Sequence, residues 1–250
     1  MSGLSEMRIA ILITNTDDSA FARARPDDGA KFTDLMHMAR PDWICTPFWV
    51  CRDEFPGNIS DFDGVVITGS PASVNAGTAW MIRLEALILD IIAQRQPLFG
   101  ACFGHQMIAR ALGAPIVANP AGWGHGLLPL GRVGQTAWAG PARKFSLYGS
   151  HSEQVGRVPP GARVVFDGPG CPVAGFAIGD HVFTVQHHPE MTHQFICDLV
   201  DYYADEVGED VTNTARASLS GRADQAAFAE EIARFFEHAV AAADKQRGGR

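Results

Sequence analysis

Short apolar runs alternate with longer amphipathic stretches along the first 112 residues of the chain. The apolar runs are rich in β-branched and aromatic residues and have the length of buried strands. They cover residues 8–14, 43–50, 64–68 and 98–99. The amphipathic stretches carry apolar side chains at helical spacing, and they cover residues 31–39, 78–94 and 105–112. This alternation of strands and helices predicts a parallel sheet with helices on both faces.

The pattern changes beyond residue 113. Residues 114–140 are rich in glycine, proline and tryptophan, which indicates antiparallel strands or a flap. Short strands are predicted at residues 146–150, 163–166, 173–178 and 182–186, and helices at residues 191–205 and 223–243. The polar residues 244–250 are expected to form a frayed tail. Because the chain has no internal repeat, we expect one α/β domain over residues 1–250, with a mostly parallel twisted sheet flanked by helices and an antiparallel extension.

Three features follow the predicted parallel strands directly. A polar segment, residues 15–30, follows the first strand and is long for a connection, as functional loops often are. The turn Gly69-Ser70 follows the third strand, and Cys102 follows the fourth. Since ligands bind outside the carboxyl ends of such strands, we expect the functional site at this edge of the sheet.

Cys102 lies between two glycines where a short strand gives way to a helix, in the segment Gly100-Ala101-Cys102-Phe103-Gly104. This is the arrangement of a nucleophile elbow, in which the backbone is strained and neighbouring side chains would crowd the nucleophile. The turn also places the sulfur at a helix N-terminus, whose partial positive charge favours a thiolate. A buried cysteine with glycines nearby would show the same residues, so this segment alone leaves both interpretations open.

A second group of polar residues, His187-His188-Pro189-Glu190, follows the strand predicted at residues 182–186. A cysteine nucleophile needs a base, and the base needs a group that orients it. Pro189 restricts the backbone on both sides, so that His188 and Glu190 can supply base and carboxylate from one short segment. A merely structural role at a polar strand end is the alternative for these residues.

A metal site is a further alternative for the same region. Its candidate ligands are His187, His188, Glu190 and His193. Adjacent histidines in an extended segment point to opposite sides, and the spacing matches no zincin helix. We therefore expect neither a metal nor an organic cofactor.

Composition narrows the class of protein. The formal net charge is -8 and the sequence has no cluster of lysine and arginine, so nucleic acid is not an expected partner. No apolar run reaches the length of a membrane span and residues 1–8 do not resemble a signal peptide, so no membrane association is expected. Five cysteines without a CxxC motif indicate reduced thiols in a cytoplasmic setting.

Together these segments resemble those of the class I, triad-type glutamine amidotransferases. The pattern of that family is G-x-C-x-G-x-Q and a later Q-x-H-P-E, which residues 100–106 and 186–190 match. Residues 67–71 resemble the family's glycine turn, and residues 150–155 its S/C-H-x-D-x-V segment, with Glu153 where aspartate is usual. The similarity runs nearly end to end and extends to stand-alone proteins like the glutaminase domain of GMP synthase, including plant γ-glutamyl peptidases.

The resemblance implies a three-layer, flavodoxin-like fold and a thioester mechanism. Cys102 would attack the γ-carbonyl of glutamine or of a γ-glutamyl group. His188 would act first as base and then as acid to the leaving amine, while Glu190 orients it. The backbone N–H groups of Gly69 and Phe103 would form the oxyanion hole.

Other residues are candidates for substrate binding. By resemblance, Gln106 would bind the glutamyl group, His151 would lie near the rim of the pocket, and Trp123 could form its wall or serve only in packing. His105 is expected to be structural. The segment 15–30 also has charged side chains that could meet the α-amino and α-carboxyl groups of a substrate, although we expect a solvated loop instead. They are Asp17, Asp18, Arg23 and Arg25.

Three functions are consistent with the sequence. The favoured one is a self-contained hydrolase that cleaves the γ-glutamyl amide bond of glutamine or of a small γ-glutamyl conjugate. The alternative is a glutaminase subunit that delivers ammonia to a separate synthetase partner. A weaker alternative is a degenerate, non-catalytic binding module, against which the intact set of Cys102, His188 and Glu190 counts.

Overall fold

The computed structural model describes residues 6–248, and within them one sheet has nine strands in the order β2-β1-β3-β4-β11-β10-β9-β6-β7. These strands are β1 (Arg8–Leu12), β2 (Ile44–Phe48), β3 (Gly64–Ile67), β4 (Leu98–Ala101), β6 (Gly124–Arg132), β7 (Lys144–His151), β9 (Arg163–Gly168), β10 (Cys171–Ile178) and β11 (Val182–Val185). From β2 to β11 the strands are parallel, and from β10 to β7 they form an antiparallel extension. Two short strands, β5 (Ile116–Ala118) and β8 (Glu153–Val155), pair separately.

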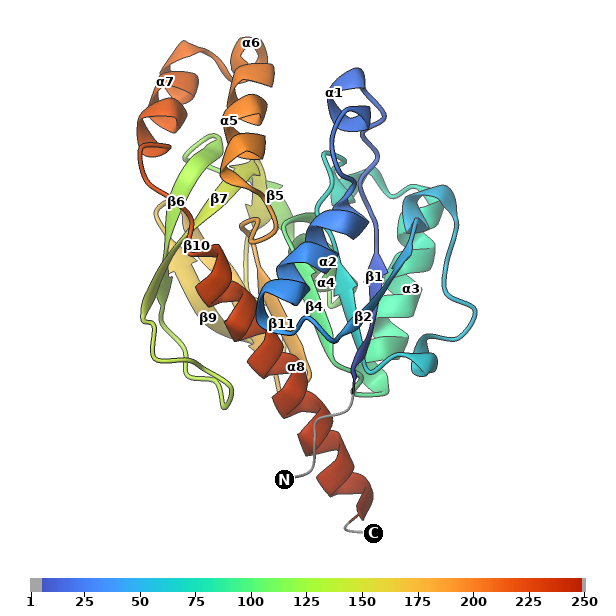
Figure 1. The fold of residues 1–250 in the computed structure, drawn as a ribbon. Coiled ribbons are helices and arrows are strands. Elements are labelled where there is room, and N and C mark those ends of the chain that lie inside the picture. The colour runs from blue at the N-terminus through green and yellow to red at the C-terminus, as the bar shows by residue number, and fades with distance from the viewer. Residues whose placement is uncertain (1–5, 249–250) are drawn as a thin grey trace.

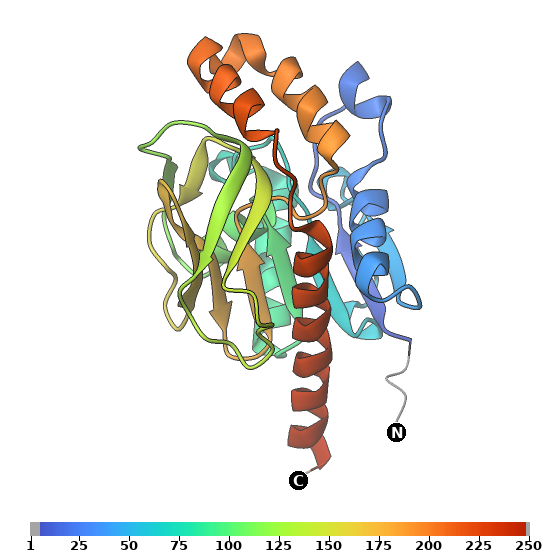
Figure 2. The ribbon, with the colours of Figure 1, turned by 60° about the vertical axis from the view of Figure 1, so that its left-hand side comes forward.

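Helices cover both faces of the parallel part (Figures 1 and 2). The helices are α1 (Ala20–Arg23), α2 (Asp28–Ala39), α3 (Ala79–Ala93), α4 (Phe103–Ala111), α5 (His193–Tyr202), α6 (Ala204–Val207), α7 (Glu209–Ser218) and α8 (Gln225–Gly248). Helices α2 and α8 pack on one face of the sheet and α3 and α4 on the other. Helices α1, α5, α6 and α7 lie beyond the end of the sheet, at the top of Figure 1. This arrangement confirms the expected α/β architecture.

The alternation of side chains along β1 shows why both faces of the sheet are covered. Ile9 and Ile11 join the core cluster that contains residues of α2 and α8. Ala10 and Leu12 join the cluster that contains residues of α3 and α4. Because successive strand residues point to opposite faces, a strand that is apolar at every position requires a helical layer on each side.

The segment expected to be a loop at residues 15–30 is shorter than predicted. It contains α1, and α2 begins at Asp28 rather than at residue 31. Side-chain capping causes both differences: Ser19 accepts a hydrogen bond from the Ala22 N–H, and Asp27 accepts one from the Ala30 N–H. The sequence therefore contained both N-caps, but its high polarity favoured a loop.

The prediction of a tail from residue 244 is also wrong where the structure describes it. Helix α8 continues to Gly248, while residues 249–250 lie outside the described residues. Within residues 210–220, for which the pattern gave no clear prediction, the structure forms most of α7. Between residues 6 and 248, no helix combines the length and the apolar character that crossing a membrane requires.

Candidate active site

Cys102 occupies the sharp turn between β4 and α4. Its backbone has φ 48° and ψ -103°, which is rare for a residue with a side chain. The turn is held by hydrogen bonds from the Cys102 N–H to the Val185 carbonyl (2.9 Å) and from the Gly104 N–H to the Thr68 carbonyl (3.1 Å). A Cβ on Gly104 would collide with the backbone of Ile67, so the close approach of α4 to β3 requires glycine there. The strained backbone is the feature expected of a nucleophile elbow.

Sheet topology brings the second polar segment to the elbow. Strands β11 and β4 are parallel neighbours, and Val185 pairs with Ala101 at their carboxyl ends. The chain beyond Val185 therefore runs beside Cys102, although 84 residues separate Gln186 from it. The His188 N–H donates to the Tyr148 carbonyl at 2.8 Å, which fixes the backbone of that segment.

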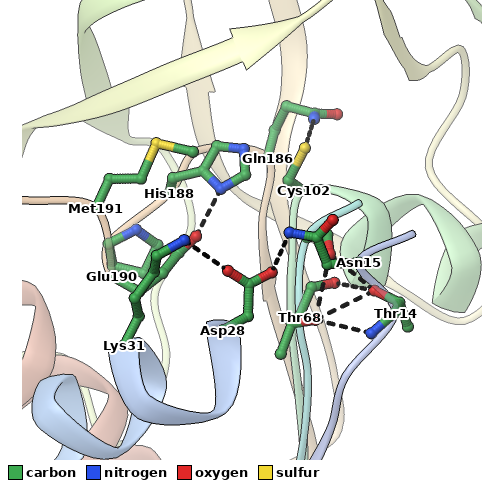
Figure 3. A network of polar contacts seen from close by, with 12 residues as sticks. Thr14, Asn15, Asp28, Lys31, Thr68, Cys102, Gln186, His188, Glu190 and Met191 are labelled. Atoms are coloured by element: carbon green, nitrogen blue, oxygen red, sulfur yellow. Dashed lines mark hydrogen bonds and ion pairs between the residues drawn. The ribbon is translucent and has the colours of Figure 1, made fainter. Parts of the chain in front are cut away.

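His188 and Glu190 form a buried pair beside Cys102 (Figure 3). The His188 Nδ1 lies 2.7 Å from the Glu190 Oε1, and the two side chains are 7% and 3% exposed. Burial opposes the charged form of His188, but the neighbouring Cys102 and Glu190 outweigh it and raise its pKa well above the ordinary value. The geometry thus favours an imidazolium at neutral pH.

Gly69 lies at the end of β3, against the same histidine. Thr14 holds this turn, because its Oγ1 contacts the Thr68 carbonyl at 3.0 Å and the Gly69 carbonyl at 2.9 Å. A Cβ on Gly69 would lie 2.7 Å from the His188 Cε1 and 3.8 Å from the Cys102 Cβ. Gly69 and Phe103 thus flank the cysteine from two elements, as the proposed oxyanion hole requires.

Gly69→Ala is expected to lower hydrolysis on the order of 100-fold, because the added methyl group displaces the His188 ring from its position beside Cys102. The measurement is the steady-state rate together with the melting temperature. Gly57→Ala is the matched control, since a Cβ there has no atom within 4 Å. A wild-type rate in Gly69→Ala would show that this close approach has no part in the reaction.

The three candidate substrate-binding residues share one cavity with Cys102. This Cys102-side cavity has a volume of about 310 Å³. An adjacent cavity of about 380 Å³, the His188-side cavity, is lined by His188 and Glu190 and by none of the three residues. The Gln106 Nε2 donates to the Glu153 carbonyl (2.9 Å) and to the Gln186 Oε1 (3.2 Å), so its amide is already held in place. Burial lowers the pKa of His151 to about 4, which makes it a neutral wall of the Cys102-side cavity.

Gln186 and Tyr203 belong to this region but were not assigned a role from the sequence. The Gln186 Nε2 lies 3.6 Å from the Cys102 Sγ and is completely buried. Tyr203, from the end of α5, lines both cavities. Gln186 belongs to the Q-x-H-P-E motif, so the sequence could have indicated its place in the site. Nothing in the sequence linked Tyr203 to the elbow.

The charged residues of the 15–30 segment line the His188-side cavity, and two of them, Asp18 and Arg23, are also exposed to solvent as the sequence predicted. Asp17, Asp18, Arg23 and Arg25 are all among its lining residues. Arg25 forms an ion pair with Asp198 of α5 at 2.7 Å, so one charge of the segment is already paired. The cavity therefore extends from His188 and Glu190 to the charged segment around α1.

Three further histidines near the two motifs, His105, His187 and His193, have contacts of their own. The His105 Nδ1 lies 2.8 Å from the Thr184 Oγ1, and burial lowers the His105 pKa to about 3, as a structural residue requires. The His193 ring contacts the Tyr148 hydroxyl and Arg222, and the His187 ring lies against His151. Among residues 6–248, no three histidine, cysteine, aspartate or glutamate side chains are arranged to hold a metal ion.

The fold and site together define an α/β protein with a cysteine elbow and a histidine–glutamate pair at the carboxyl edge of a parallel sheet. The chain belongs to the glutamine amidotransferase class-I family, whose model matches residues 48–195. This confirms the resemblance drawn from the two motifs.

Relatives of the chain carry several names. Gamma-glutamyl peptidase 3 of Arabidopsis thaliana is 29% identical over 166 residues, which are 62% of this chain and 66% of that protein. GMP synthase [glutamine-hydrolyzing] of Aeropyrum pernix is 32% identical over 155 residues, 58% of this chain and 28% of that protein. The chain thus spans less than two thirds of each of these relatives. A crystal structure of a glutamine amidotransferase from Thermotoga maritima shares the fold, with a TM-score of 0.71, 18% identity and coverage of 94% of this chain and 98% of that one.

Proposed function

We propose that the protein is a cysteine hydrolase that cleaves the γ-glutamyl amide bond of a small γ-glutamyl conjugate. The Cys102 thiolate attacks the γ-carbonyl, and the His188 imidazolium gives its proton to the leaving amine as the C–N bond breaks. This leaves a γ-glutamyl thioester on Cys102. His188 then takes a proton from water, whose oxygen attacks the thioester. The C–S bond breaks, which restores the Cys102 thiolate and the His188 imidazolium, and the product leaves as glutamate after its new carboxyl group loses a proton to solvent. Glu190 orients His188, and the N–H groups of Gly69 and Phe103 stabilise the oxyanion.

Two adjacent cavities, one lined by Cys102 and the other by His188, carry this proposal, and Ser70, Pro71, Ser150 and Tyr203 line both of them. The Cys102 side, with Gln106, Trp123 and His151, is placed to take the glutamyl group. The His188 side, of about 380 Å³, is where a leaving group protonated by His188 would lie. Ammonia, the leaving group of free glutamine, needs no such cavity, whereas an amine, amino acid or peptide would fill it.

The relatives named gamma-glutamyl peptidases support the same proposal. The five cysteines, all within the described residues and all free, support a reducing, cytoplasmic location. The second candidate function is the glutaminase part of a two-part amidotransferase, which the match to 28% of a GMP synthase favours. In that case, the mouth of the His188-side cavity would face a synthetase subunit.

Release of glutamate by the purified protein tests the proposal. The substrates are free glutamine and a panel of γ-glutamyl amides and dipeptides, with Cys102→Ala as the blank. Turnover of a conjugate well above that of glutamine is expected. Turnover of glutamine alone, or only after addition of a synthetase, would replace the proposal by the glutaminase alternative.

A further inference from the structure

Asp28 and Lys31 form a buried ion pair at the start of α2 that the proposed mechanism does not use. The Lys31 Nζ lies 2.9 Å from the Asp28 Oδ1, and the two side chains are 12% and 7% exposed. The Asn15 Nδ2 donates to the other Asp28 oxygen at 3.0 Å. Burying two charges carries a desolvation cost, so a buried ion pair is weak evidence for stability. What sets this pair apart is its place in the cavity that His188 and Glu190 line.

The ion pair faces Glu190 across the His188-side cavity. Asp28, Lys31 and Glu190 all line that cavity, and Figure 3 shows Lys31 extending from α2 toward the end of the site that holds His188 and Glu190. Burial raises the pKa of Asp28, Lys31 opposes the rise, and the charge of Glu190 adds to it. The two carboxylates are thus close enough for each to act on the charge of the other.

Glu190 has one oxygen that is still available. Its Oε1 contacts His188, while its Oε2 is buried and has no hydrogen-bond partner within the described part of the chain. A buried carboxylate oxygen without a partner attracts any cation that can reach it. If Lys31 paired with this oxygen, Glu190 would have less negative charge to offer the His188 imidazolium.

We propose that Asp28 is a positioning residue, which holds Lys31 in an ion pair on α2 and thereby keeps the ammonium from pairing with Glu190. Glu190 then interacts with His188 alone. The catalytic role of Asp28 rests on the proposed function. The effect of Asp28 on the charges of Lys31, Glu190 and His188 does not depend on that function.

Other titratable groups lie close enough to influence the charges of His188 and Asp28. His151 and His187 act on His188 from β7 and from the neighbouring position, and Cys51 lies near Asp28. Six further charged residues line the cavity: Asp17, Asp18, Arg23, Arg25, Asp27 and Arg52. The test therefore needs a double variant, which changes the Asp28–Lys31 pair and leaves these groups in place.

The experiment measures the rate of alkylation of Cys102 by iodoacetamide as a function of pH, in the full chain without substrate. Asp28→Asn is expected to move the His188 inflection of the alkylation profile about one pH unit lower, because the released Lys31 pairs with Glu190. Alkylation should be slower than in the wild type over the pH range between the two inflections. Asp28→Asn/Lys31→Met is expected to restore the wild-type profile. Lys31→Met alone should also keep it, since this variant has no ammonium at position 31 that could pair with Glu190.

A matched control is the buried ion pair between Arg132 and Glu231, which is 2.8 Å long and 3% and 2% exposed. Arg132→Met should lower the melting temperature without moving the alkylation profile. If Asp28→Asn has the wild-type profile, or if Lys31→Met fails to rescue it, Asp28 does not act by holding Lys31.

Failure of the proposed function would look different. Alkylation requires only Cys102 and the charges around it, so this pattern can hold in a protein that hydrolyses no γ-glutamyl compound. Conversely, if the protein hydrolyses such a compound but Lys31→Met does not rescue Asp28→Asn, the proposed function stands and only the proposed role of Asp28 is contradicted.

Discussion

Cys102→Ala is expected to abolish hydrolysis of γ-glutamyl compounds, with a loss on the order of 10⁴-fold or more. The Cys102 thiolate is the only protein group in the proposed mechanism that forms a covalent bond to the substrate. The elbow keeps its shape in the variant, because its backbone hydrogen bonds to Val185 and Thr68 do not involve the sulfur. Glutamate release measures the loss.

The melting temperature distinguishes loss of chemistry from loss of folding in this variant. Alanine fits the space of the buried cysteine, so a melting temperature within a few degrees of the wild type is expected. Cys171→Ala is the matched control, since Cys171 is also buried but lies in β10 and lines neither cavity. Hydrolysis that survives in Cys102→Ala would remove Cys102 from the mechanism.

His188→Ala is expected to lower hydrolysis by about 10³- to 10⁴-fold, since it removes the acid and base of both steps. It should also change the pH dependence of Cys102 alkylation. In the wild type the raised pKa of His188 keeps the ring protonated at neutral pH, and the proton is lost only as the pH rises through that raised value. Below it the imidazolium favours a thiolate on Cys102, and His188→Ala removes that positive charge.

The alkylation rate of His188→Ala at pH 7 should therefore fall on the order of tenfold or more, and the two proteins should converge at alkaline pH. His238→Ala is the control, because His238 lies on α8 beside Asp180 and away from the site. Unchanged alkylation at pH 7 would contradict the role of His188 as the partner of Cys102.

The parallel half of the fold and the core of the site could be predicted from the sequence because local patterns encode them. An apolar run such as residues 8–14 can be satisfied only by burial on both faces, and glycines around Cys102 have few uses other than a tight turn. The joining of Cys102 to His188 also depends on the parallel pairing of β4 with β11, which the sequence did not predict, because residues 182–186 were assigned to the antiparallel extension.

The rest of the site depends on contacts between distant segments. Asp28 was within a polar stretch expected to be a loop, and its importance appears only when α2 places it across a cavity from Glu190. Tyr203 reaches the site from α5, and Phe21 of α1 stacks on Tyr202 with ring centroids 4.5 Å apart. Neither contact has a local sequence signal. The first joins the elbow region to a segment beyond residue 190, and the second joins a segment before residue 30 to the same region.

The measurement that tests the central claim most directly is the mass of the protein after acid quenching during turnover of a γ-glutamyl conjugate. We expect a species heavier by one glutamyl group, with the added mass on the peptide that contains Cys102, and none in Cys102→Ala. His188→Ala should show little of it, since its thiolate forms poorly at neutral pH. Turnover without any glutamyl group on Cys102, or with the group on another residue, would contradict the thioester mechanism.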